Sequence, residues 1–161
     1  MLVLGVGNPS RGDDALAPLL LERAAVELAP ALARGELELL TDFQLQIEHA
    51  LDLVGRTRVL FVDASVRAAA PFEVLRVTPA RDASATTHAL SPAAVLATHA
   101  AVAGQPPEAW LLAIRGERFE LGEGLSDAAR ENLAAAVQHL AALVTGSTAW
   151  AAVGREVVGR P

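Results

Sequence analysis

The chain has 161 residues, of which 52% are hydrophobic, and this length and composition fit one compact domain with a sizeable core. Its formal charge of −6 argues against a nucleic-acid or anionic-membrane partner, because binding to phosphate needs clustered Lys and Arg. The absence of cysteine excludes disulfides, thiolate catalysis and Cys-ligated zinc.

Apolar runs and helical periods alternate along the chain. Residues 2–6 are typical of a buried strand closed by Gly7, and a helix is expected from Ala15 to Pro30, with Asp13 or Asp14 as its N-cap. Ser91 and Ser126 are natural caps for two later helices. The other expected elements are strand 36–40, helix 46–54, strand 58–63, strand 71–76, helix 91–104, strand 110–114 and helix 126–144. In helix 46–54 one face is expected to hold Ile47, Ala50, Leu51 and Val54.

This alternation predicts an α/β fold: a single domain with a doubly wound, mostly parallel sheet of about five strands and helices on both faces. We place the domain at residues 1–144 and expect residues 145–161 to form a partly disordered tail. The N-terminus lacks the basic segment and cleavage site of a signal peptide, so we expect a cytoplasmic protein without a membrane partner.

Ligands of doubly wound sheets bind beyond the carboxyl ends of the strands. The candidate catalytic and metal-binding residues of this chain are expected at that edge. Asp13 and Asp14 follow the first strand, Asp63 ends the third, and His88 precedes the helix capped by Ser91. Two carboxylates and an imidazole make an incomplete oxygen and nitrogen site for a divalent ion such as nickel or zinc. Each of these residues also has a purely structural interpretation, since an Asp before a helix is more often a cap and a lone His is usually a loop residue.

Several strings, in order over residues 2–144, resemble the hydrogenase maturation proteases, which process the large subunits of [NiFe]-hydrogenases. They are LGVGN at 4–8 with the acidic pair 13–14, LFVDA at 60–64, THAL at 87–90, GERFE at 116–120 and GLS at 124–126. The resemblance implies an endopeptidase that removes the C-terminal extension of a nickel-loaded large-subunit precursor. It also implies that the precursor supplies the nickel, which zinc or cadmium can replace in vitro. A monomer is the simplest expectation for a protein that must grip a large precursor.

Carried over by position, the resemblance makes Asp14, Asp63 and His88 the metal ligands and Asp14 and Asp63 the catalytic residues. Asp14 replaces the glutamate usual in the family, and Asp13 competes for the same role. Hydrolysis is expected to use either a metal-polarised carbonyl or a water activated by one of the carboxylates. A second departure lies at residues 42–46, DFQLQ, where many relatives have a glycine-rich stretch. It indicates adaptation to another class of hydrogenase.

Two other functions stay open. A non-catalytic module that binds the hydrogenase precursor would have the same ligands. A nucleotide-binding domain is disfavoured, because the third glycine of Gly5-x-Gly7…Gly12 comes too late for a dinucleotide loop and the acidic pair would repel a pyrophosphate. The other three histidines are expected at the surface or the edge of the core rather than as ligands: His49, His99 and His139.

Overall fold

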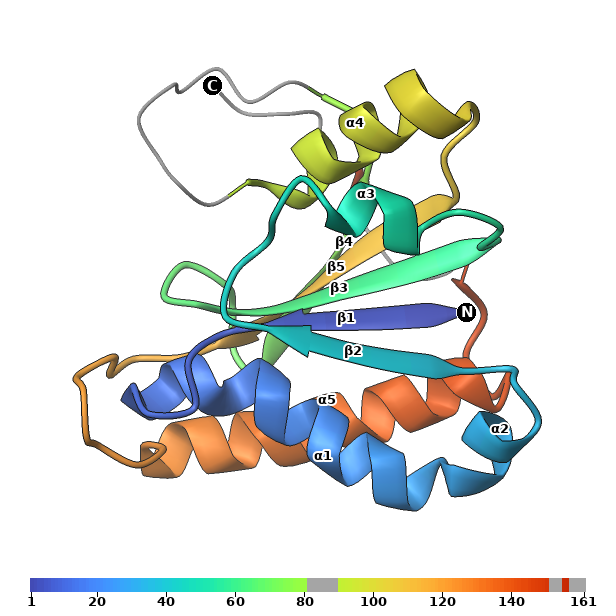
Figure 1. Ribbon diagram of the computed structural model, residues 1–161. Coiled ribbons are helices and arrows are strands. Elements are labelled where there is room, and N and C mark those ends of the chain that lie inside the picture. The colour runs from blue at the N-terminus through green and yellow to red at the C-terminus, as the bar shows by residue number, and fades with distance from the viewer. Residues whose placement is uncertain (81–89, 151–154, 157–161) are drawn as a thin grey trace.

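The computed structural model describes residues 1–80, 90–150 and 155–156 (Figure 1). In chain order its elements are β1 (Leu2–Val6), the 3-10 turn η1 (Gly12–Ala15), α1 (Leu16–Glu27), α2 (Ala29–Ala33), β2 (Glu38–Asp42), α3 (His49–Asp52), β3 (Arg58–Ser65), β4 (Phe72–Val77), α4 (Pro92–Ala103), β5 (Glu108–Arg115), α5 (Asp127–Val144) and β6 (Arg155–Glu156). Of the tail predicted to be partly disordered, residues 151–154 and 157–161 lie outside the described residues. No helix in the described ranges is both long and apolar enough to cross a membrane.

The strands form one sheet in the order β2-β1-β3-β5-β4-β6. β1, β2, β3 and β5 are parallel, whereas β4 is antiparallel to β5 and β6 runs parallel to β4. Helices α1, α2 and α5 cover one face and α3 and α4 the other, which confirms the predicted doubly wound fold (Figure 1). The reversed strand is β4, because the short segment 66–71 cannot complete the crossover that a parallel neighbour requires.

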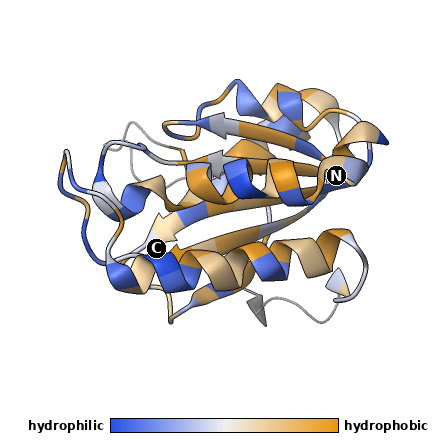
Figure 2. Cartoon of the chain, turned by 90° about the horizontal axis from the view of Figure 1, so that it is seen from below, coloured by the Kyte–Doolittle hydropathy of each residue, from blue (hydrophilic) through white to orange (hydrophobic). Residues whose placement is uncertain are grey.

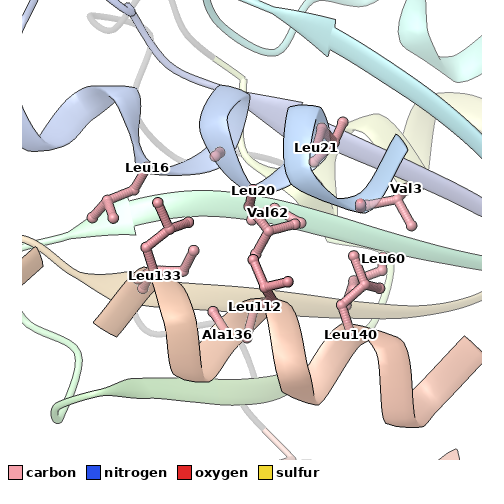
Figure 3. Close-up of a cluster of buried hydrophobic side chains, with 14 of the residues drawn as sticks. Val3, Leu16, Leu20, Leu21, Leu60, Val62, Leu112, Leu133, Ala136 and Leu140 are labelled. Atoms are coloured by element: carbon pink, nitrogen blue, oxygen red, sulfur yellow. The ribbon is translucent and has the colours of Figure 1, made fainter. Parts of the chain in front are cut away.

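Side chains alternate across the sheet and form a hydrophobic core on each face. Toward α1 and α5 lie Val3, Leu60, Val62 and Leu112, which meet Leu16, Leu20, Leu133 and Leu140 of the helices (Figure 3). Toward α3 and α4 lie Leu2, Leu4, Val59 and Phe61. Strands buried on both faces explain the uninterrupted apolar runs of the sequence. In Figure 2 the strands are coloured largely as hydrophobic, whereas α1 and α5 mix hydrophilic and hydrophobic residues.

Both predicted serine caps are confirmed, but the predicted aspartate cap is wrong. Ser91 Oγ accepts a hydrogen bond from Ala94 N, and Ser126 Oγ from Ala129 N. The first helix begins instead through η1, and neither η1 nor α1 has a side-chain cap. The physical reason is that the carboxylates of Asp13 and Asp14 are engaged elsewhere. Neither aspartate therefore has the N-capping role that the sequence predicted.

The prediction that Ile47, Ala50, Leu51 and Val54 share one face of the short third helix is also wrong. Leu45, Ala50 and Leu53 pack into the core, while Ile47, Leu51 and Val54 are exposed. The helix itself spans only His49–Asp52, with turns on either side, so a helical period counted over 46–54 assigns the wrong face. The result is an apolar surface that the core does not use.

Candidate active site

The loop after β1 places the acidic pair at the carboxyl edge of the sheet. Gly7 lies so close to the turn that a Cβ atom built on it would collide with the carbonyl oxygen of Asp14, and its φ of +151° is one that side chains rarely adopt. Only glycine therefore allows this approach. The loop is also tied to the segment after β5, because Gly12 N donates to Glu123 O and Gly122 N donates to Ser10 O.

Asp13 is fully buried and holds the segment that follows β5. Its carboxylate accepts hydrogen bonds from Glu117 N at 2.7 Å, Arg118 N at 3.0 Å, Ser126 N at 2.7 Å and Ser126 Oγ at 2.9 Å. Burial opposes ionisation, but these donors outweigh it and lower the pKa of Asp13 below its ordinary value. Four bonds use the acceptor capacity of the two oxygens. Asp13 therefore supports the fold, and Asp14 stays the predicted ligand.

Asp14 is half-buried and lies in η1, directly before α1. Its Oδ2 accepts a hydrogen bond of 2.9 Å from Asn8 N, which orients the carboxylate back across the loop. No other hydrogen bond to this side chain occurs within the described ranges, so Oδ1 has capacity for a ligand.

Asp63 lies near the end of β3, the strand next to β1, where the chain order of the sheet reverses. Burial raises the pKa of its carboxyl to about 6, a hydrogen bond with the Ala64 backbone opposes this, and the negative charge of Asp14 adds to the rise. The two carboxylates are thus close enough to repel each other. Such a pair suits a divalent cation, which relieves the repulsion, or a proton transfer near neutral pH.

The third predicted ligand, His88, lies outside the described residues. Across residues 1–80, 90–150 and 155–156, no three His, Cys, Asp or Glu side chains group closely enough to hold a metal ion. The described structure therefore supplies two carboxylates of the predicted set. Leu90, the first described residue after the gap, donates its N–H to the carbonyl of Leu45 in the loop after β2.

A cleft opens between the loops that follow β1 and β2, next to the backbone of Asp14, and neither Asp14 nor Asp63 is among the side chains that line it. It has a volume of about 340 Å³ and is lined by Gly7, Pro9, Pro18, Thr41, Asp42 and Phe43. Gly7 N donates to Asp42 O across its floor at 3.1 Å. The cleft lies at the carboxyl ends of β1 and β2, the edge where doubly wound sheets bind their ligands.

Sequence reasoning missed the pairing of Asp42 with His49. His49 is 6% exposed, its Nδ1 accepts a hydrogen bond from Gln46 N at 2.9 Å, and its Nε2 lies 3.4 Å from Asp42 Oδ2. Asp42 also accepts from Phe43 N at 2.6 Å. A carboxylate ending a strand, as at Asp63, was the available signal. The expectation that His49 is not a functional residue did not consider Asp42, which lies seven residues earlier in the chain.

The other two histidines also contact the core. His99 is buried on α4, and its Nδ1 lies 2.8 Å from the carbonyl of Ala50. His139 of α5 stacks against Phe72 with ring centroids 4.9 Å apart, and burial lowers its pKa. Both therefore stabilise contacts between elements away from the acidic pair.

No protein-family model and no curated protein sequence matches the chain, but solved structures do. The hydrogenase maturating endopeptidase HybD from Escherichia coli superimposes with a TM-score of 0.66 at 25% identity, over 91% of this chain and 92% of its own. This chain has the fold of the hydrogenase maturation proteases. The maturation protease HycI from Thermococcus kodakarensis gives a TM-score of 0.64 at 21% identity, over 89% of this chain and 91% of its own. The endopeptidase HycI from Escherichia coli gives 0.66 at 21%, over 99% and 98%.

The comparisons confirm the resemblance found in the sequence strings. Coverage near the full length on both sides means that the fold of the α/β domain is shared.

Proposed function

We propose that this protein is an endopeptidase of hydrogenase maturation, which removes the C-terminal extension of a nickel-loaded [NiFe]-hydrogenase large-subunit precursor. The observation that carries the proposal is the pair Asp14 and Asp63, which lie close enough to interact at the carboxyl edge of the sheet on a maturation-protease fold. The similar structures are named as endopeptidases and maturation proteases, which supports a hydrolase.

The carboxylates suit a role in recognising the metal of the substrate. Nickel binds nitrogen and oxygen ligands. Asp14, Asp63 and His88 would offer such donors to the ion that the precursor brings. Binding through that ion would place one peptide bond beside the site. Specificity then comes from positioning rather than from a pocket for a particular side chain.

Asp63 is the better candidate for the proton transfers. With a pKa raised to about 6 by burial, its carboxylate is largely ionised at neutral pH and still basic enough to take a proton from an attacking water. The oxygen of that water would bond to the carbonyl carbon, and the proton would pass to the leaving amine as the C–N bond breaks. The metal supplied by the substrate would polarise the carbonyl in the alternative route.

The test is to incubate the purified protein with a large-subunit precursor from the same organism, nickel-loaded and nickel-free in parallel, and to follow the masses of the products. One C-terminal fragment released from the loaded precursor alone is the expected result. Intact loaded precursor that nevertheless forms a stable complex with the protein would show a non-catalytic binding module instead.

A further inference from the structure

Four large apolar side chains form an exposed ridge beside the cleft. Phe43, Ile47, Leu51 and Val54, called here the apolar ridge, are 68%, 56%, 64% and 56% exposed. Leu51 lies on α3, Ile47 and Val54 lie in the turns on either side of it, and Phe43 lies in the loop that leads to it. Scattered apolar residues are ordinary on a surface, but a contiguous group marks an interaction site.

The ridge is held in place from beneath. Ala50 and Leu53 anchor its segment in the core, His99 of α4 contacts the Ala50 carbonyl, and the Asp42–His49 pair fixes the turn at its start. A partner that docks here would therefore meet a surface that is already formed, and little ordering of the chain would oppose binding.

The ridge is continuous with the cleft, and its border is acidic. Phe43 belongs to both, since it lines the cleft next to Asp42 and also begins the ridge. Between the apolar positions stand Glu48 and Asp52, both exposed. An apolar centre with a charged border is the usual composition of a protein interface, and the negative border favours a partner with basic residues there.

We infer that the apolar ridge docks the folded body of the hydrogenase large-subunit precursor, through an apolar patch with a basic border next to the segment that enters the cleft. This inference rests on the proposed function. Its occupant is a protein whose peptide lies in the adjoining cleft, because the two surfaces share Phe43. The ridge thus adds affinity for the whole precursor, in addition to the contact at the metal.

The experiment compares Leu51→Glu and Val54→Glu with Val26→Glu, a control on α1 at a valine that is 79% exposed on the opposite face of the sheet. Processing of the nickel-loaded precursor by the two ridge variants should show KM raised about tenfold or more with kcat unchanged, as expected for loss of an interface anchor. The control should match the wild type, and all melting temperatures should agree, because none of these side chains is buried. Equal KM values for ridge variants and control would overturn the inference while leaving the proposed function intact.

A direct binding measurement separates the two hypotheses. If the wild type fails to cleave, the proposed function fails, and the ridge is judged by the affinity of each variant for the precursor. Weaker binding by the ridge variants alone supports the inference, and equal or absent binding overturns it. Sedimentation at assay concentrations adds one further outcome: a wild-type dimer that Leu51→Glu dissolves, with unchanged affinity for the precursor, would assign the ridge to a second copy of this chain and overturn the inference.

Discussion

Replacing Asp63 by Asn should stabilise the metal-free protein at alkaline pH. Burial raises the pKa of this carboxyl from 3.8 to about 6, so the folded state favours its protonated form. A group whose pKa is higher in the folded than in the unfolded state contributes stability below the unfolded value, and this contribution is lost as the pH rises through the folded value. Above pH 6 the wild type therefore carries the cost of an ionised, partly buried carboxylate, which Asn does not have.

The size of the effect follows from the rise in pKa. An increase from 3.8 to about 6 corresponds to about 3 kcal/mol once both states are ionised, near pH 8. At pH 4.5 most of the folded and part of the unfolded carboxyl is protonated, and the difference shrinks to about 1 kcal/mol. Asp63→Asn should thus gain stability relative to the wild type between these two pH values.

The assay is urea unfolding of both proteins with a chelator present, followed by circular dichroism at pH 4.5, 6 and 8. Asp52→Asn, on the exposed side of α3, is the control and should change the free energy of unfolding by no more than about 0.5 kcal/mol. A wild type more stable than Asp63→Asn at pH 8, or a difference that does not grow with pH, would refute the reasoning. It would mean that hydrogen bonding outweighs burial at this carboxylate.

Three further predictions concern the loop after β1. Asp14→Asn should lower the pKa of Asp63, because the negative charge of Asp14 contributes to the rise of that pKa. Chemical shifts of the carboxyl carbon measured against pH report the pKa, and an unchanged value would mean that the two carboxylates do not interact. Asp13→Asn should destabilise the fold by about 2 to 4 kcal/mol in denaturant unfolding, since an amide NH₂ group would face backbone donors that now bond to a buried carboxylate. A loss below about 0.5 kcal/mol would show that these hydrogen bonds contribute little stability. Gly7→Ala should cost about 2 kcal/mol or more, because its methyl group would strike the backbone of Asp14, and wild-type melting behaviour in this variant would contradict the described loop.

The sequence predicted those parts of the fold that depend on local pattern. β1, β3 and β5 are apolar runs between glycines and polar residues, and Ser91 and Ser126 cap α4 and α5 as expected. The second strand was placed too early, at 36–40 rather than Glu38–Asp42. Its end is set by pairing of Asp42 with Val6 on β1, which no local pattern records.

The site was only partly predictable, for a similar reason. Asp14 and Asp63 stand at strand ends, and the parallel topology alone brings such residues to one edge. The role of Asp13 depends on Glu117, Arg118 and Ser126, more than a hundred residues along the chain, and the adjacent aspartate looks identical in the sequence. The exposure of Leu51 likewise depends on how a short helix seats its neighbours Ala50 and Leu53 against the sheet.

The central claim is that the two carboxylates at the carboxyl edge of the sheet process the precursor, and it is tested most directly by comparing initial rates of variants. Asp14→Asn and Asp63→Asn would be assayed on one nickel-loaded precursor beside the wild type and Glu22→Gln, an exposed control on α1. The account predicts that both aspartate variants lose at least about a hundredfold in rate while remaining folded, and that the control keeps the wild-type rate. Release of the C-terminal fragment by Asp63→Asn at the wild-type rate would contradict it.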